Sequence, residues 1–360
     1  MRLLYLEELS GRVDPSIAEF EWNDMSIRVL RNLSSDRIRA LPIAVLYITD
    51  KCNSRCTSCD YWRRGQNEMP LSLVERLAGE LSDLGTRYVL LSGGEPLQHS
   101  AWVRIAAAFR TKGAKVGMAT SGILLPKHAS AIGENLDEIY VSLDGATPES
   151  YKSIRGVDGF ELVREGVEKI AGRLPVTFRT TVQRANYSEL PDLLRLTLSM
   201  GAAHHSFLAV DVNTHAAFGR SGFFDRSMAL GVQDLDPFTS VVEDIIREFS
   251  GEIRRGYIPE SASKLRNLQA YFSALLGLRP FPPVRCNAPS FSAVVETDGA
   301  IKPCFFLPAA GHLGDEPVIE SLNTEAGKTL RRQQLAGHRD ECVRCVCPSF
   351  KSTRTLRREF

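Results

Sequence analysis

The chain has 360 residues, of which 43% are hydrophobic and 24% charged, a composition typical of a globular protein with one ordinary core and a smaller appended domain. Its 44 Lys and Arg residues nearly balance its 43 Asp and Glu residues, which leaves a formal net charge of +1. Because this balance would not attract a polyanion, the composition gives no support to partners such as nucleic acid or an anionic membrane surface.

The first 42 residues predict a helical extension. Apolar residues recur at roughly helical spacing between Pro15 and Ala40. Acidic residues at positions 7 and 8 stand where a signal peptide would extend its apolar core, and the chain has no run of about 18 apolar residues. We therefore expect a cytoplasmic protein without a membrane partner.

From residue 43 onward, strand-like and helix-like segments alternate. Six apolar runs predict strands, with room for a crossover helix between them, at 43–48, 88–92, 115–119, 138–143, 175–182 and 205–210. This alternation is typical of parallel strands joined by helices. Six such units, over residues 43–215, are fewer than the eight that close a full barrel.

A loop with three cysteines, Cys52, Cys56 and Cys59, follows the first run directly. Thiolates are suitable ligands for zinc and for iron–sulfur clusters. A closed structural zinc site needs a fourth ligand, and the nearest histidine along the chain is His99. A cluster with three protein ligands would instead leave one iron open to another molecule.

Polar residues follow the second, third and fourth predicted strands. Ligands of parallel α/β folds collect at the carboxyl ends of the strands. Two glycines after the second run would let the backbone approach a ligand closely. Asp144 contacts a ligand or merely caps the following turn. The candidate ligand contacts at these strand ends are Gly93, Gly94, Glu95, Thr120, Ser121, Ser142 and Asp144.

The fifth and sixth predicted strands carry further candidates. Arg179 alternates with Thr177 and Thr181, which would place one polar face toward the barrel interior. An inward Arg is costly unless it meets an anion, either on a ligand or in a structural salt bridge to Glu95 or Asp144. Polar groups near the end of the sixth strand are substrate contacts or part of a solvated loop: Asp211, Asn213 and His215, with Leu208 just before them.

The rest of the chain predicts a helical bridge over 216–280 and a second unit over 281–360. The second unit holds five cysteines and a β-hairpin with an Asp-Gly turn at 298–299. A zinc ribbon would need paired ligands, which the isolated Cys286 and Cys304 do not provide. Because all eight cysteines fall in two close groups, metal binding is favoured over disulfide bonds.

These motifs together resemble the radical S-adenosylmethionine (SAM) enzymes that carry a C-terminal SPASM/twitch domain. The resemblance rests on the C-x3-C-x2-C loop, the Gly-Gly-Glu-Pro stretch, and the later C-x12-G-x4-C and C-x2-C spacings. It implies an α/β fold, a partial (βα)6 TIM-like barrel with a small C-terminal α+β domain. It also implies a 4Fe-4S cluster whose open iron binds SAM. Reduction by a flavodoxin- or ferredoxin-type donor then yields a 5′-deoxyadenosyl radical.

The resemblance also implies roles for particular residues. Cys52, Cys56 and Cys59 would hold the first cluster, and an auxiliary 4Fe-4S cluster would be held by Cys286, Cys304, Cys342 and Cys345. Cys347 is a spare thiol or an alternative to Cys345. The position before Cys59, often aromatic in the family, is Ser58 here, so stacking on the adenine would fall to Tyr61 or Trp62, or be absent. Other expected SAM contacts are Gly93, Gly94, Glu95, Thr120, Ser121, Ser142, Asp144, Arg179 and Leu208, and Arg179, Asp211 and His215 are expected in catalysis.

Three functions follow from these expectations. The first is hydrogen abstraction from a polar small molecule, such as a sugar, aminocyclitol or nucleoside, leading to dehydrogenation, elimination or decarboxylation, or epimerisation. The second is modification of a ribosomally made peptide, against which the short, helical N-terminal stretch counts. The third is a non-catalytic iron–sulfur electron carrier, which the Gly93-Gly94-Glu95 stretch disfavours. One sequence does not choose the substrate, because one fold serves many reactions.

Overall fold

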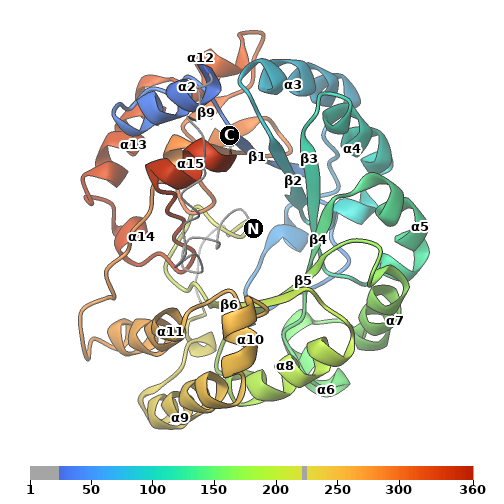
Figure 1. The fold of residues 1–360 in the computed structure, drawn as a ribbon, viewed down its shortest axis with the longest axis vertical. Helices are drawn as coiled ribbons and strands as arrows, with labels where there is room; N and C mark the ends of the chain where they lie inside the picture. Colours follow the sequence, from blue (N-terminus) through green and yellow to red (C-terminus); the bar gives the residue numbers. More distant parts are fainter. Residues whose placement is uncertain (1–23, 221–224, 360) are drawn as a thin grey trace, which may run out of the picture.

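A nine-stranded sheet forms the centre of the molecule in the computed structural model, which describes residues 24–220 and 225–359 (Figure 1). Its strands lie in the order β6-β5-β4-β3-β2-β1-β7-β8-β9. The first six run parallel to one another. They are β1 (Ile43–Thr49), β2 (Tyr88–Gly93), β3 (Lys115–Thr120), β4 (Glu138–Ser142), β5 (Val176–Val182) and β6 (His204–Ala209).

All six predicted strands are present, and each boundary lies within one residue of its expected position. The crossover helices lie on the outer side of the curved sheet (Figure 1). They are α3 (Leu71–Asp83), α4 (Trp102–Arg110), α5 (Leu125–Asn135), α6 (Pro148–Arg155), α7 (Phe160–Ile170) and α8 (Leu190–Ser199). The predicted partial barrel is therefore confirmed, and it is open.

Helix α3 shows why these segments fold as they do. Val74, Leu77, Ala78 and Leu81 recur at helical spacing and are all buried, so one apolar stripe faces the sheet. Gly85 follows the helix with φ +75°, a conformation that glycine adopts without strain. Burial of such stripes on the outer face of the sheet forms the main core.

The predicted hairpin in the C-terminal part is present, but it continues the main sheet. Strand β7 (Ser292–Val295) pairs in parallel with β1, and β8 (Ala300–Lys302) returns antiparallel to β7. Gly299 turns the chain with φ +90°. The short β9 (Gly311–His312) ends the sheet. The C-terminal unit is thus attached to the barrel by the pairing of its strand β7 with β1.

Helices fill the remaining parts of the chain. Between β6 and the hairpin lie α9 (Val232–Glu248), α10 (Ser250–Arg255) and α11 (Ala262–Leu275), and after it lie α12 (Val318–Leu322), α13 (Glu325–Leu335), α14 (Asp340–Val343) and α15 (Thr353–Glu359). Of the helices expected between Pro15 and Ala40, α2 (Asp24–Leu33) is present, and the part before Asp24 lies outside the described residues.

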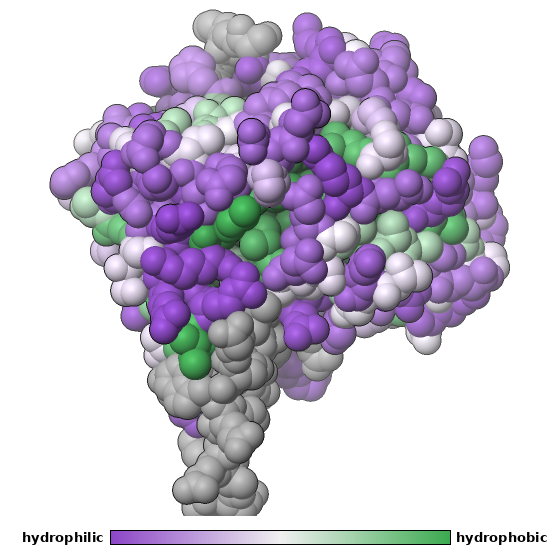
Figure 2. All heavy atoms as spheres, turned by 90° about the horizontal axis from the view of Figure 1, so that it is seen from above, coloured by the Kyte–Doolittle hydropathy of each residue, from purple (hydrophilic) through white to green (hydrophobic). Residues whose placement is uncertain are grey.

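The surface agrees with the balanced composition. Hydrophilic residues cover most of the face in Figure 2, and hydrophobic residues show mainly in a hollow between them. In the described parts of the chain, no helix combines the length and the apolar character that crossing a membrane requires.

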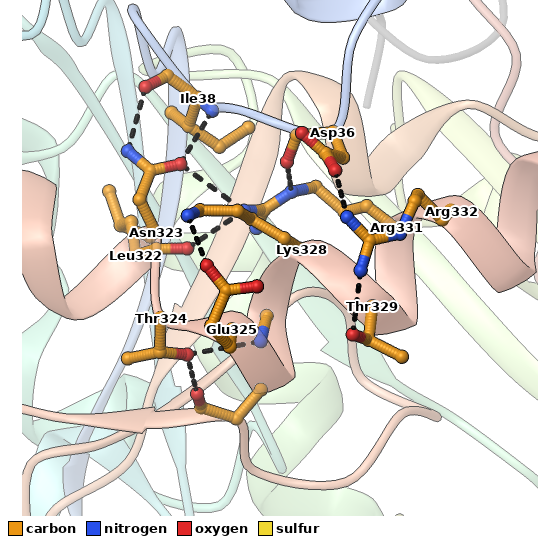
Figure 3. A network of polar contacts seen from close by, with 12 residues as sticks. Asp36, Ile38, Leu322, Asn323, Thr324, Glu325, Lys328, Thr329, Arg331 and Arg332 are labelled. Carbon is orange, nitrogen blue, oxygen red and sulfur yellow. Dashed lines mark hydrogen bonds and ion pairs between the residues drawn. The ribbon is translucent and has the colours of Figure 1, made fainter.

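A polar network joins the segment before β1 to the C-terminal helices (Figure 3). The Asn323 side chain accepts from the Ile38 amide (2.8 Å) and donates to the Ile38 carbonyl (2.9 Å). Arg331 donates to the Asn323 side chain (3.2 Å), to the Leu322 carbonyl (3.0 Å) and to the backbone of Asp36. One buried amide therefore fixes the start of the barrel against α12 and α13.

Replacement of Asn323 tests this attachment. Asn323→Ala leaves the buried Ile38 amide and carbonyl without partners, so we expect unfolding free energy to fall by about 1–3 kcal/mol in chemical denaturation. Glu325→Ala, which removes an exposed Glu325–Lys328 pair two residues later, is the matched control and should change little. Equal stability of the two variants would contradict the network.

Candidate active site

The loop with Cys52, Cys56 and Cys59 follows β1 and is clamped by the end of α6. The Arg55 amide donates to the Arg155 carbonyl (2.9 Å), and the Thr57 amide donates to the Ile154 carbonyl (3.0 Å). Gly156, at φ +70°, permits this approach, because a Cβ there would lie 2.4 Å from the Arg55 carbonyl oxygen. Two backbone bonds thus fix the middle of the three-cysteine loop.

A buried ion pair supports this clamp. Arg155 donates to Asp144 (3.1 Å), and Asp144 also accepts from the Thr181 amide of β5 (2.7 Å). Burial lowers the pKa of Arg155, but Cys56 and Asp144 outweigh burial and raise it above its ordinary value. This buried carboxylate is therefore held by the protein, and a SAM contact at Asp144 stays a prediction.

All eight cysteines are free thiols and half-buried, as metal binding rather than disulfide bonding predicts. Burial raises the pKa of Cys52 to about 11 and that of Cys59 to about 12. A metal centre takes up thiolates, so its binding here must release these protons. Within the described ranges, no three Cys, His, Asp or Glu side chains are grouped so as to hold a metal ion.

Glu95 and the end of β3 come together as the sequence predicts for one site. The fully buried Glu95 carboxylate accepts from the Thr120 hydroxyl (2.7 Å), the Ser121 amide (2.7 Å) and the Ser121 hydroxyl (2.6 Å). Ser121 also contacts Asn53 in the cysteine loop (3.0 Å). The carboxylate of Glu95 therefore points toward the end of β3 and, through Ser121, is linked to the cysteine loop.

Gly93 and Gly94 serve close packing of the backbone. A Cβ on Gly93 would lie 2.4 Å from the Thr49 carbonyl oxygen, and one on Gly94 would lie 2.3 Å from that of Lys51. The Gly94 amide donates to the Thr49 carbonyl (2.8 Å). The chain entering the cysteine loop thus already demands glycine at both positions, and their contact with a ligand stays a prediction.

Tyr61 is bound to the C-terminal hairpin. Its hydroxyl donates to Glu296 (3.0 Å), and its ring packs edge-on against Tyr47 with centroids 5.2 Å apart. Arg64 (2.8 Å) and Lys302 (2.5 Å) pair with the same carboxylate. With 4% of its surface exposed, Tyr61 is held within the protein, and its stacking on an adenine stays a prediction.

Sequence reasoning missed Glu296. The only signal was an acidic residue directly before the Asp-Gly turn of a predicted hairpin. Its partners Arg64 and Tyr61 are 232 and 235 residues away in sequence, so spacing could not reveal their place in the cluster.

Of the polar residues expected at the barrel mouth, Asp211 and Asn213 lie together, since the Asn213 amide donates to Asp211 (3.1 Å). Asp211 is buried, pairs with Arg220 (2.7 Å), and accepts from the Thr214 amide and hydroxyl, and its expected substrate contact stays a prediction. His215 is exposed. The side-chain nitrogen of Asn213 is buried without a hydrogen-bond partner.

Arg179 and Leu208 line different cavities. Arg179 lies in a cavity of about 130 Å³ beside inward residues of β1, β2 and β4, namely Ile43, Val45, Tyr88, Leu90 and Tyr140. Leu208 lines a second cavity at the edge of the sheet. The predicted inward direction of Arg179 agrees with its place in the barrel interior. Ser142 lies opposite Arg179 in the pairing of β4 with β5.

The five C-terminal cysteines line the cavity that contains Arg179. They are Cys286, Cys304, Cys342, Cys345 and Cys347. Burial raises the pKa of Cys304 to about 12 and that of Cys342 to about 11. The Cys347 amide donates to the Cys345 sulfur (3.4 Å). The chain on either side of the hairpin, at Cys286 and Cys304, and the segment 342–347 thus carry all five thiols to the inner side of the barrel.

Comparison with known proteins identifies the family. Residues 46–197 match the model of the Radical SAM superfamily, and this range includes the three-cysteine loop and Glu95. These residues form a radical SAM domain. The prediction from the cysteine spacing is confirmed, and with it the cofactors of this superfamily, a 4Fe-4S cluster and SAM.

Two curated relatives differ in their sequence identity to this chain and in the share of it that they cover. A probable GTP 3′,8-cyclase of Thermococcus kodakarensis is 36% identical over 162 residues, 43% of this chain and 52% of that protein. The chain thus spans about half the length of the curated relatives it matches first. An AdoMet-dependent heme synthase of Methanosarcina barkeri is 25% identical over 342 residues, 85% of this chain and 91% of that protein.

Two solved structures share the fold over most of the chain. SuiB of Streptococcus suis, bound to S-adenosylmethionine, superimposes with a TM-score of 0.64 at 14% identity, over 91% of this chain and 77% of that chain. The anSMEcpe structure with bound AdoMet and a peptide gives 0.62 at 16% identity, over 86% and 89%. This likeness extends beyond the radical SAM domain, as the resemblance to SPASM/twitch enzymes predicts.

The packing of Gly94 against the cysteine loop can be tested by stability. Gly94→Ala forces a Cβ into the Lys51 backbone, so we expect a loss of about 1–3 kcal/mol from overpacking, measured by denaturant unfolding. Gly79→Ala is the matched control, since nothing lies within 4 Å of its Cβ position in α3. That variant should gain about 0.5–1 kcal/mol from helix propensity. A stabilised Gly94→Ala protein would refute the packing argument.

Proposed function

We propose that this radical SAM enzyme abstracts a hydrogen atom from a small molecule that carries polar or anionic groups. The observation that carries the proposal is the position of Arg179, which lies in the barrel interior in one cavity with the C-terminal thiols. An inward guanidinium offers five N–H donors, which suit a carboxylate, a phosphate or several hydroxyl groups. The buried Asn213 nitrogen offers another donor.

The thiols suit the cofactors of the family by their chemistry. Cys52, Cys56 and Cys59 would hold the SAM-binding cluster, and Cys286, Cys304, Cys342 and Cys345 would hold an auxiliary one. A 4Fe-4S cluster binds each thiolate through a different iron, so its ligands need not converge on one ion. When bound, the first cluster and SAM supply a radical that takes a hydrogen atom from an unactivated C–H bond. In this assignment Cys347 is a spare thiol whose amide supports the Cys345 sulfur.

The protein's own residues would position SAM and the substrate and would exclude water. Glu95, Thr120 and Ser121 would keep the strand ends rigid beside SAM, and Gly93, Gly94 and Ser142 would contact it through backbone and hydroxyl groups. The hairpin would hold the cysteine loop through Glu296 and Tyr61. Fixed geometry of this kind lowers the barrier by pre-ordering the reactants, and a closed cavity prevents the radical from reacting with water.

Relatives matched by sequence support a small molecule over a peptide. The two curated relatives described above are named for GTP cyclisation and for heme synthesis, and the heme synthase matches over most of the chain. The structures solved with peptides are only 15% and 16% identical to this chain. At that level of identity the likeness indicates a shared fold and not a shared substrate. Peptide modification is therefore the second candidate, and a sugar, aminocyclitol or nucleoside substrate is the first. The reaction would be of the oxidoreductase or lyase type.

The proposal also covers the domain boundaries of the chain, its cellular location and its electron donor. Residues 43–215 would form the radical SAM core, 216–280 a helical bridge, and 281–360 the auxiliary-cluster domain, with 1–42 as an extension. We propose a cytoplasmic location and a flavodoxin- or ferredoxin-type electron donor.

The iron content tests the two clusters. We expect about eight irons per chain after anaerobic reconstitution, because the thiols form two sets that each suit a 4Fe-4S cluster. Joint replacement of Cys52, Cys56 and Cys59 by Ala should halve the iron and abolish SAM cleavage. Cys345→Ser should also halve it, whereas Cys347→Ser, the matched control, should not. About four irons in the unmodified protein would contradict a second cluster.

The substrate class is tested by coupled turnover. Reduced enzyme and SAM are incubated with sugars, aminocyclitols, nucleosides and ribosomal precursor peptides, and release of 5′-deoxyadenosine is measured above the uncoupled background. We expect coupling with a small molecule, and transfer of deuterium from that compound when labelled. Arg179→Gln should raise its KM by about 10–100-fold through loss of a charged donor. Coupling only with a peptide would overturn the small-molecule proposal.

A further inference from the structure

A second cavity lies at the open edge of the barrel. It has a volume of about 470 Å³, and its lining comes from β6, α11 and the segments 281–285 and 343–350. Strand β6 is the end strand of the nine-stranded sheet. Cys345 lines both this cavity and the one that contains Arg179, so the two cavities adjoin.

Glu260 is a buried carboxylate in the lining of this edge cavity. The residue is 4% exposed, and its Oε1 accepts from the Phe207 amide of β6 (3.2 Å). Its Oε2 is buried and has no hydrogen-bond partner. A buried carboxylate oxygen without a donor is costly, so a protein keeps one where something else supplies the donor.

The position of Glu260 is fixed by its neighbours. The His205 amide donates to the Tyr257 carbonyl (2.8 Å), so the segment 257–260 follows the edge of β6. Ser261 then caps α11 by accepting from the Lys264 amide. Burial raises the pKa of Glu260 to about 7, an effect that the nearby charges of Arg179 and Lys264 oppose. The carboxylate is thus held in place between a strand edge and a helix start.

We propose that the edge cavity binds an amine-bearing part of the substrate, whose ammonium group donates to Glu260. A charged donor is favoured over a hydroxyl, because a charge-assisted bond offsets the burial of a carboxylate better than a neutral one. Much of the remaining lining is apolar, including Phe281, Pro282, Val346 and Phe350, and would pack against a ring. The inference rests on the proposed small-molecule function and narrows it to an amino-substituted compound such as an aminocyclitol.

Paired probes test the site. Streptamine carries two amines on a cyclitol ring, and scyllo-inositol carries hydroxyl groups alone. We expect calorimetry on the reconstituted enzyme with SAM to show streptamine binding at least about tenfold more tightly than scyllo-inositol. Glu260→Gln should weaken streptamine binding by about tenfold or more and remove this preference. Glu260→Asp, which keeps the charge, should retain the preference at lower affinity.

Controls separate this inference from the proposed function. Glu243→Gln makes the same chemical change on the exposed face of α9 and should bind both probes as the unmodified protein does. Iron content should be unchanged in Glu260→Gln, and its loss would mean that Glu260 is structural and overturn the inference. It is also overturned if the unmodified enzyme fails to bind streptamine, or if Glu260→Gln binds it equally well. An unmodified enzyme that does not cleave SAM would overturn the proposed function itself, whatever the probes do.

Discussion

The pairing of β1 on both of its sides is the constraint on which the site depends. Ile43 lies opposite Tyr88 of β2 on one side and opposite Ser292 of β7 on the other. Since all three strands are parallel, their carboxyl ends meet at one edge of the sheet. The loop with the three cysteines leaves β1 at this edge, and Glu296 leaves β7 beside it. One strand therefore brings the N-terminal and C-terminal cysteine groups into a single rigid body.

Buried charges fix the loops around that edge. The Arg155–Asp144 pair anchors the end of α6, and the Arg220–Asp211 pair orders the loop after β6. Each of these segments also touches the cysteine loop through its backbone: the Asp60 amide donates to the Phe218 carbonyl (2.8 Å), as Thr57 does to Ile154. Buried pairs add little net stability, because desolvation offsets their attraction, but they permit few alternative arrangements. Here that selectivity holds a loop of reactive thiols in one conformation.

The strands could be predicted because their signal is local. A parallel strand buried on both faces reads as an almost continuous apolar run, and each of the six runs gave a strand. The polar residues at the strand ends could be located because they directly follow these apolar runs. The direction in which their side chains point could not be predicted. Asp211 faces its own loop because Arg220 lies nine residues later, and Tyr61 is bound by a carboxylate 235 residues away. The need for Gly94 likewise depends on the backbone of Lys51, which no spacing along the chain reveals.

The two edges of the open barrel are closed by different means, and this difference places the access route. At β1 the edge is continued by three more strands, whose ladder pairs the backbone groups. At β6 the amides of His205 and Phe207 are met by a backbone carbonyl and by the Glu260 side chain. An exposed edge would invite pairing with another chain, so some cover is required. A side chain satisfies one amide but leaves space beside it that a strand would fill, and a carboxylate brings a second oxygen into that space. The cavity at β6 and the unpartnered oxygen of Glu260 thus have one cause, the capping of a sheet edge by a side chain in place of a strand.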